Sequence, residues 1–143
     1  MTSQKPPEKI RHAHEKAVEA RSRAHAPYSK FKVGAALLTG SGRVFQGCNI
    51  ENASYGGAVC AERVAILKSV SEGDLTFTDI VVVTDTPDPA FPCAFCLQVM
   101  AEFFEPETKI WIADLERIHG VHEFQKLLPH PFGPRQLGDA KKG

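Results

Sequence analysis

The six residues DIVVVT, Asp79–Thr84, constrain the fold more than any other stretch of this sequence. They include a continuous β-branched run, which is typical of a strand buried on both faces. Such a strand needs other elements packed on each side of its sheet. The run therefore predicts an interior strand of an α/β fold.

The segments around this run alternate between strand-like and helix-like patterns. Apolar residues recur at helical spacing from Ile10 to Ala24, and Pro27 ends that run. Two strand-like runs within 31–52 flank the turn residues Gly40–Gly42, which predicts a hairpin. Further elements are expected in this order: a helix over 60–70, the strand 79–84, a helix over 93–104, a strand over 109–113 and a helix over 121–128. The order predicts a three-layer α/β/α fold, with helices on both faces of one mixed sheet of about five strands.

Length and charge limit the function classes. A chain of 143 residues is expected to form a single domain, with residues 10–134 as its core and short mobile tails that include 133–143. Lysine plus arginine and aspartate plus glutamate number 17 each, and this zero net charge argues against a nucleic-acid partner. The sequence has no signal-peptide pattern and no run of 18 apolar residues, so we expect a cytoplasmic protein.

Three of the four cysteines stand at the predicted starts of two helices. Cys60 opens the helix over 60–70, and Cys93 and Cys96 open the helix over 93–104. Residues three apart on a helix lie on the same side, with Cβ atoms roughly 5 to 6 Å apart. Helix N-termini also lower the pKa of nearby thiols and favour the thiolates that bind metals. The spacing therefore predicts one metal ion bound by three thiolates.

Three ligands leave one position of a tetrahedral ion open, which is typical of a catalytic rather than a structural zinc. A structural site would need Cys48 or a histidine as its fourth ligand, but Cys48 is interpreted as a small buried hydrophobe within a strand. The six histidines form no ligand-like pair with a cysteine: His12, His14, His25, His119, His122 and His130. A redox pair is the other alternative, but it would need only the C-x-x-C and would leave Cys60 unexplained.

Glu62 follows Cys60 by two residues, and such neighbours do not share a helix face. Its carboxylate is therefore expected beside the metal site rather than as a fourth ligand. There it would act as a proton shuttle, which is the role of the non-ligand glutamate of zinc deaminases. The alternative is a glutamate that only complements the helix dipole.

The sequence resembles the cytidine deaminases of the small, homotetrameric class. The resemblance covers residues 10–134 and is carried by five motifs in the same order. These are APYSKFKVGAALL, GCNIENASYGGAVCAERVAI, SEGD, PCxxCxQV and LLPHPFGP. It implies a cytidine deaminase-like fold and hydrolytic conversion of cytidine and 2′-deoxycytidine to uridine and 2′-deoxyuridine. Ammonia is released, and the reaction belongs to pyrimidine salvage.

The resemblance assigns the metal site and the catalytic group. One zinc ion per subunit is implied at Cys60, Cys93 and Cys96, where it activates a water to attack C4 of cytosine. Glu62 would take the proton of that water, pass one to the ring N3 and help the amine to leave. Arg63 would donate hydrogen bonds to the thiolates and offset their excess negative charge.

The resemblance also assigns the substrate contacts. Asn49 and Glu51, two residues apart on a strand and therefore on one face, would hold the ribose 3′-hydroxyl. The base pocket would be lined by Phe31 and by the backbone at Tyr55 and Ala61. Phe132 would stack on the base in the site of a neighbouring subunit, with anchoring of its own C-terminal loop as the alternative. A homotetramer with shared sites is therefore expected.

The sequence departs from the family at PCAFCLQV, where the usual motif is PCGACRQV. Ala94 and Phe95 replace glycine and alanine, and Leu97 replaces an arginine next to the last ligand. These changes have two interpretations: packing differences away from the substrate, or a pocket reshaped by Phe95 for a modified pyrimidine nucleoside.

Three rivals stay open. A deaminase of an aminonucleoside antibiotic shares the chemistry, and a non-catalytic zinc-binding interaction module shares the ligands. A polynucleotide or tRNA deaminase is disfavoured by the neutral charge, by CNIEN and by a cysteine rather than a histidine at position 60.

Overall fold

A five-stranded mixed sheet forms the centre of the protein. We describe it from a computed structural model in which residues 5–142 are described. The strands are β1 (Val33–Thr39), β2 (Val44–Cys48), β3 (Phe77–Thr84), β4 (Lys109–Ala113) and β5 (Ile118–Glu123). Their order across the sheet is β2-β1-β3-β4-β5, with β3 and β4 parallel and all other neighbouring pairs antiparallel. The prediction of a mixed sheet of about five strands is confirmed.

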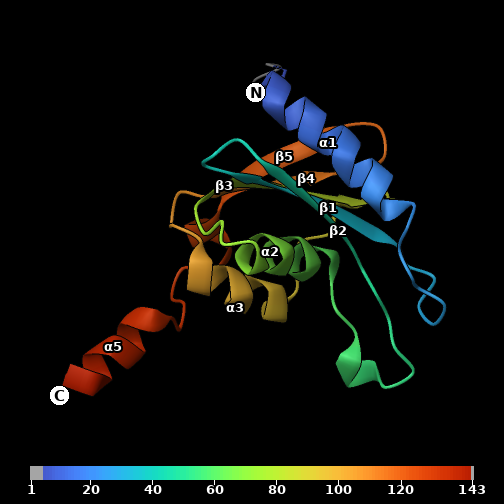
Figure 1. Ribbon diagram of the computed structural model, residues 1–143. Coiled ribbons are helices and arrows are strands. Elements are labelled where there is room, and N and C mark those ends of the chain that lie inside the picture. The colour runs from blue at the N-terminus through green and yellow to red at the C-terminus, as the bar shows by residue number, and fades with distance from the viewer. Residues whose placement is uncertain (1–4, 143) are drawn as a thin grey trace.

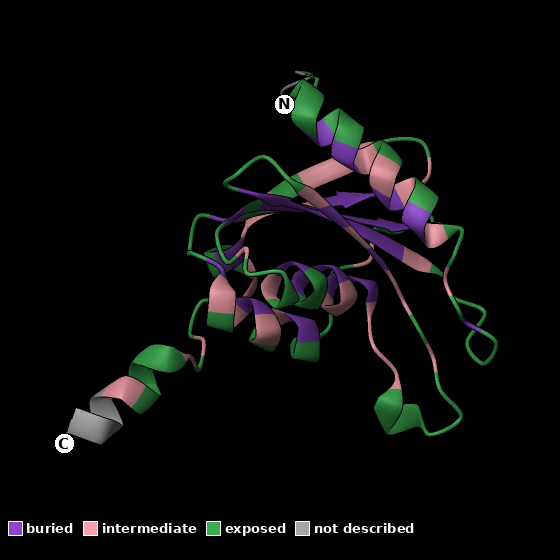
Figure 2. Cartoon of the chain, in the orientation of Figure 1, coloured by how far each residue is buried: buried purple, intermediate pink, exposed green. Residues whose placement is uncertain are grey.

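Helices cover both faces of this sheet (Figure 1). Helix α1 (Glu8–Arg21) lies on one face, and α2 (Ala61–Ser71) and α3 (Ala94–Phe103) lie together on the other. Two apolar cores result, and the buried residues gather on the strands and on the helix sides that face them (Figure 2). Because β3 contributes Val81 and Val83 to one core and Ile80 and Val82 to the other, its continuous apolar run is required.

Helix α2 positions the site, and it is enclosed on several sides. It packs on β1 and β2 and also against α3, and Ala65 and Ile66 are fully buried. This explains why its sequence is apolar around most of its circumference rather than on one stripe. Its N-terminus and that of α3 are therefore held in fixed positions below the sheet.

The C-terminal part of the chain differs from the prediction. The helix expected over 121–128 is wrong in its first half, because residues up to Glu123 belong to β5 and only α4 (Phe124–Leu127) is helical. The local sequence is ambiguous, and pairing with β4 decides the outcome: Val121 lies opposite Trp111 in the ladder. This pairing satisfies backbone groups that a helix would otherwise satisfy internally.

The segment after Gly133 forms helix α5 (Pro134–Lys142), where the sequence predicted an irregular tail. Pro134 occupies the first helical position, where its missing N–H costs little. The Gln136 side chain accepts a hydrogen bond from the Gly133 N–H at 2.7 Å, as in one half of a capping box. The predicted tail residues 1–4 and 143 lie outside the described residues. Between residues 5 and 142, no helix has both the length and the apolar character needed to span a membrane.

Candidate metal centre and active site

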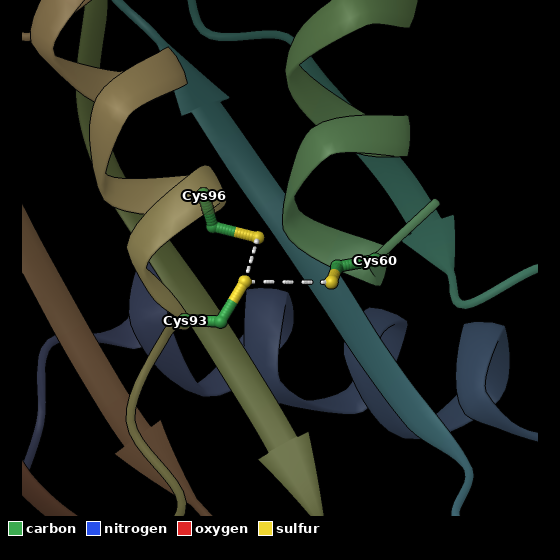
Figure 3. Close-up of side chains that lie close together, drawn as sticks. All are labelled: Cys60, Cys93 and Cys96. Atoms are coloured by element: carbon green, nitrogen blue, oxygen red, sulfur yellow. Dashed lines mark hydrogen bonds between the residues drawn. The ribbon is translucent and has the colours of Figure 1, made fainter. Parts of the chain in front are cut away.

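The first turns of α2 and α3 bring three sulfur atoms together. Cys60 is the N-cap of α2, Cys93 is the N-cap of α3, and Cys96 lies in the first turn of α3. Neither N-cap side chain makes a capping hydrogen bond with the backbone of its helix. Figure 3 shows that all three sulfurs point toward one another instead. The two helix starts predicted from the sequence therefore converge on one point.

The sulfur positions match the dimensions of a zinc site. The Sγ atoms of Cys60 and Cys93 are 3.7 Å apart, and those of Cys93 and Cys96 are 3.6 Å apart. All three atoms lie within 4.8 Å of one another. Ligands at a Zn–S distance of about 2.3 Å and tetrahedral angles are about 3.8 Å apart. The residues present thus fit zinc.

No fourth protein ligand joins the group within the described part of the chain, where the three cysteines form the metal-ligand cluster by themselves. Cys48 is the last residue of β2, is half-buried rather than buried, and stays outside the cluster. Two of the histidines are engaged elsewhere: His14 contacts the Asp114 carbonyl at 2.8 Å, and His119 contacts the Asp114 carboxylate at 2.7 Å. The arrangement keeps one tetrahedral position open for a small ligand.

The thiols of the cluster shift one another's pKa values. Interaction with the Cys96 thiol, together with hydrogen bonds from Arg63 and Cys93, lowers the pKa of Cys60 to about 5. The same contact and burial raise the pKa of Cys96. The protein alone therefore favours a Cys60 thiolate and a Cys96 thiol, and binding of a divalent cation displaces the remaining protons.

Arg63 supplies positive charge next to the sulfurs. Its Nη2 donates to Cys60 Sγ at 3.6 Å. Burial acts to lower the pKa of Arg63, but hydrogen bonds and attraction to Cys60 and Cys96 outweigh it and raise that pKa. Because three thiolates on a divalent ion carry an excess negative charge, this guanidinium partly offsets it.

Glu62 is the buried carboxyl group beside the cluster. Its residue is 5% exposed, and this burial, more than any other factor, raises the pKa of its side chain to about 7. The Cys60 thiolate pushes the pKa in the same direction. A carboxyl group with such a pKa can accept and return a proton near neutral pH.

Two cavities meet at the sulfur cluster. The smaller, about 230 Å³, contains Glu62 in its wall together with Phe31 and Phe91. The larger, about 400 Å³, is lined by Arg63 and Phe95 among others. Both share four residues: Asn49, Glu51, Cys60 and Cys93. A small molecule in the smaller cavity would therefore contact Cys60, Cys93 and Glu62 simultaneously.

Asn49 and Glu51 lie just beyond β2, which ends at Cys48, and not on the strand as predicted. Ile50 between them forms isolated bridges with His25 and Val59, so the backbone stays extended. Both side chains consequently reach the same cavities. Their common orientation does not depend on formal strand structure.

Both side chains also anchor the loop before β1. Asn49 accepts a hydrogen bond from the Val33 N–H and donates one to the Phe31 carbonyl, each at 2.8 Å. Glu51 accepts bonds from the Ser29 hydroxyl and from the backbone N–H groups of Ser29 and Tyr28. Ser29 was not singled out from the sequence, although it stands in the first of the five motifs.

Of the other predicted substrate contacts, two line the cavities and two do not. Phe31 lines the smaller cavity, and Tyr55 lines the larger one with its ring edge-on to Tyr28. Ala61 is fully buried at the start of α2 and is absent from both linings. Phe132 is 57% exposed and is also absent from them, and its carbonyl accepts a hydrogen bond from Gln98 at 2.8 Å.

The residues that depart from the family motif have different surroundings. Leu97 packs against the apolar core below the sheet. Phe95 lines the larger cavity but not the cavity that contains Glu62. This separation favours the first interpretation, packing differences, because Phe95 does not line the cavity that contains Glu62. Phe91 does line that wall, and the sequence offered no periodicity or spacing that would have identified it.

Comparison with known proteins agrees with this geometry. A family model described as the cytidine and deoxycytidylate deaminase zinc-binding region matches residues 7–111. A cytidine deaminase from Halalkalibacterium halodurans is 46% identical over 86% of this chain and 93% of its own length. A cytidine deaminase from Sporosarcina psychrophila is 43% identical over 85% of this chain and 90% of its own length.

Solved structures give the same result. The crystal structure of cytidine deaminase from Burkholderia pseudomallei matches with a TM-score of 0.82 and 42% identity, over 92% of this chain and 100% of that one. The crystal structure of cytidine deaminase from Mycobacterium tuberculosis matches with a TM-score of 0.74 and 34% identity, over 87% of this chain and 97% of that one. Family model, relatives and fold agree along most of the chain, so the protein belongs to the zinc-binding cytidine and deoxycytidylate deaminase family.

Proposed function

We propose that this protein hydrolyses cytidine and 2′-deoxycytidine to uridine and 2′-deoxyuridine, with release of ammonia. The observation that carries the proposal is the buried Glu62, which lines one cavity together with Cys60 and Cys93 of the sulfur cluster. The two cytidine deaminases described above, which are 46% and 43% identical over most of this chain, support the choice of substrate. The reaction belongs to pyrimidine salvage, because it converts one nucleoside into another.

The metal ligands of the proposal are Cys60, Cys93 and Cys96. When bound there, zinc supplies the Lewis acidity that makes water nucleophilic near neutral pH. The thiolates hold their charge for this purpose at two helix N-termini, where backbone dipoles favour negative charge. Arg63 limits the excess of that charge through its hydrogen bond to Cys60.

Glu62 moves the protons. Its carboxylate takes a proton from water as the oxygen adds to C4 of cytosine, and the carboxylic acid then protonates N3. The second proton of the water passes through the same side chain to the exocyclic nitrogen. The C4–N4 bond breaks, ammonia leaves, and a carbonyl forms at C4. A pKa near 7 suits both halves of this transfer.

The sugar end of the substrate would lie at Asn49 and Glu51. Each side chain retains hydrogen-bonding capacity beyond the bonds that anchor the loop, so an amide and a carboxylate can hold a ribose hydroxyl. C4 is opposite N1 in the cytosine ring. A sugar held at this end therefore directs the reacting carbon toward Glu62, with Phe31 beside the base.

The site would be completed by a neighbouring subunit in a homotetramer. Phe132 is exposed and outside the cavities of its own chain, which supports a contact with the base in another subunit. Tyr55 is 76% exposed at the mouth of the larger cavity, which supports burial by a partner. A cytoplasmic location belongs to the same proposal, because a reducing compartment keeps the three thiols available for zinc.

Replacement of Glu62 by glutamine tests this function. We expect Glu62→Gln to lower kcat for cytidine on the order of a hundredfold or more, measured by the loss of cytidine absorbance. Zinc content should stay at one ion per subunit, because Glu62 is not a ligand. Glu102→Gln on the exposed side of α3 is the matched control and should keep wild-type activity. A fully active Glu62→Gln enzyme would refute catalysis and favour a zinc-binding interaction module.

A further inference from the structure

Phe95 lies over the arginine that contacts the metal ligands. Its side chain is 75% exposed, which is unusual for a phenylalanine in the first turn of a packed helix. The Arg63 guanidinium carbon lies 5.7 Å from the centre of the Phe95 ring. This distance is within the range of a cation–π interaction. Phe95 thus reaches the cluster through Arg63 rather than through the Glu62 cavity.

Arg63 has few other contacts that hold it in place. Its Nη2 bonds to Cys60 Sγ at 3.6 Å, and its buried Nε has no hydrogen-bond partner. Among the side chains described, those of residues 5–138, no carboxylate forms an ion pair with it. By contrast, Arg43, which lies 4.6 Å over the Phe45 ring, is also fixed by Glu72. The ring of Phe95 is therefore a substantial part of what orients Arg63.

The chain lacks a second cation that the usual family motif would place near the sulfurs, so Arg63 matters more here. Leu97 stands where that motif has an arginine directly after the last ligand, and Leu97 packs in the core. Near the sulfurs, the task of offsetting the third thiolate thus falls to Arg63. A long flexible side chain does this well only if its rotamers are restricted.

We propose that Phe95 is a positioning residue for the zinc site: its ring holds the Arg63 guanidinium against the Cys60 thiolate and so slows release of the metal. The inference rests on the proposed function only in taking zinc as the ion bound by the three cysteines. Phe95 itself supplies no ligand atom and does not line the cavity that contains Glu62.

The rate of zinc release to an excess of chelator tests this role without any use of catalysis. We expect Phe95→Leu, which keeps apolar bulk but removes the aromatic face, to release zinc about three- to fivefold faster than wild type. Phe95→Tyr retains the ring and should stay within about twofold of the wild-type rate. Because Phe95 is so exposed, these variants are expected to fold normally.

The same substitution in Arg63→Gln protein shows whether Phe95 acts by positioning Arg63 or only by its own packing. In Arg63→Gln protein, zinc release should already be fast, and adding Phe95→Leu should change it no further. An equal effect of Phe95→Leu in both backgrounds, or no effect in the first, would overturn the proposal. A raised KM for cytidine with unchanged zinc release would also overturn it, because Phe95 would then contact the substrate.

The proposed function can fail separately. If wild-type protein holds one zinc per subunit but does not deaminate cytidine, the function is wrong and the release rates still decide the role of Phe95. If wild-type protein holds no zinc, both proposals are overturned.

Discussion

In the proposed function Glu51 has two roles that use the same oxygens: it anchors the loop before β1 through Ser29, and it holds a sugar hydroxyl. The carboxylate accepts bonds from the Ser29 hydroxyl and from two backbone N–H groups, so the loop before β1 fixes its orientation. These bonds also lower the pKa of Glu51 and keep it ionised. A fixed, charged carboxylate can accept a hydrogen bond from a sugar hydroxyl without first losing rotamer freedom.

Removal of the Ser29 hydroxyl should therefore weaken nucleoside binding. We expect Ser29→Ala to raise KM for cytidine about three- to tenfold, with a smaller change in kcat, because one hydrogen bond that orients Glu51 is lost. Ser71→Ala on α2 is the control, since its hydroxyl also donates to a nearby oxygen, the Lys68 carbonyl at 2.9 Å, away from the cavities. A Ser29→Ala enzyme with wild-type KM would show that Glu51 needs no such support.

At the scale of elements, the position of α2 depends on a close approach to β2. A Cβ atom built on Gly47 would lie 2.4 Å from the Ala61 carbonyl oxygen and 2.6 Å from the Ala65 nitrogen. Both contacts are with helix backbone, which cannot move without shifting the whole first turn. Since Cys60 and Glu62 flank Ala61, any such shift would reach the metal site.

Two glycine substitutions separate an effect on folding stability from an effect on the geometry of the metal site. Gly47→Ala should destabilise the protein by about 1 to 3 kcal/mol and weaken zinc binding in the molecules that fold. Gly34→Ala is matched to it, because its Cβ would lie 2.0 Å from the Ala17 oxygen of α1 on the opposite face. It should destabilise the fold comparably but keep zinc affinity. Urea unfolding and zinc titration measure the two effects, and equal zinc affinities would contradict the assigned role of Gly47.

At the scale of the whole molecule, a single subunit lacks a complete site in our proposal. Phe132 lies outside the cavities of its own chain and Glu62 lies inside, so the two residues should serve different sites. Phe132→Ala should raise KM for cytidine roughly tenfold through the loss of a stacked ring. Its subunits should still bind zinc normally.

Mixed oligomers provide the sharper test. When Phe132→Ala protein and Glu62→Gln protein are co-expressed, some sites combine an intact Glu62 with an intact Phe132 from a neighbour. Activity at low cytidine concentration should then exceed the sum of the two parents. If Phe132 only anchors its own C-terminal loop, mixing should restore no activity.

The elements near the site were predictable from sequence, whereas the C-terminal ones were not. Strand β3 and helices α2 and α3 are apolar enough that burial decides their conformation wherever they are placed. The β5 segment carries no such pattern, and its pairing with β4 overrode a weak helical signal. Helix α5 did carry a local signal, Pro134 followed by Gln136, but it contains too few apolar residues to predict it from hydrophobic spacing.

The sequence by itself determined which atoms are available: three thiols and a carboxyl group at two helix starts, because the spacing of residues within one helical turn is a local property. Tertiary structure decided how these atoms act on one another. It set the 3.7 Å approach of Cys60 to Cys93, the burial that raises the pKa of Glu62, and the contact between Phe95 and Arg63. These features arise between segments distant in sequence, where packing on a shared sheet rather than local preference sets distance and solvent access.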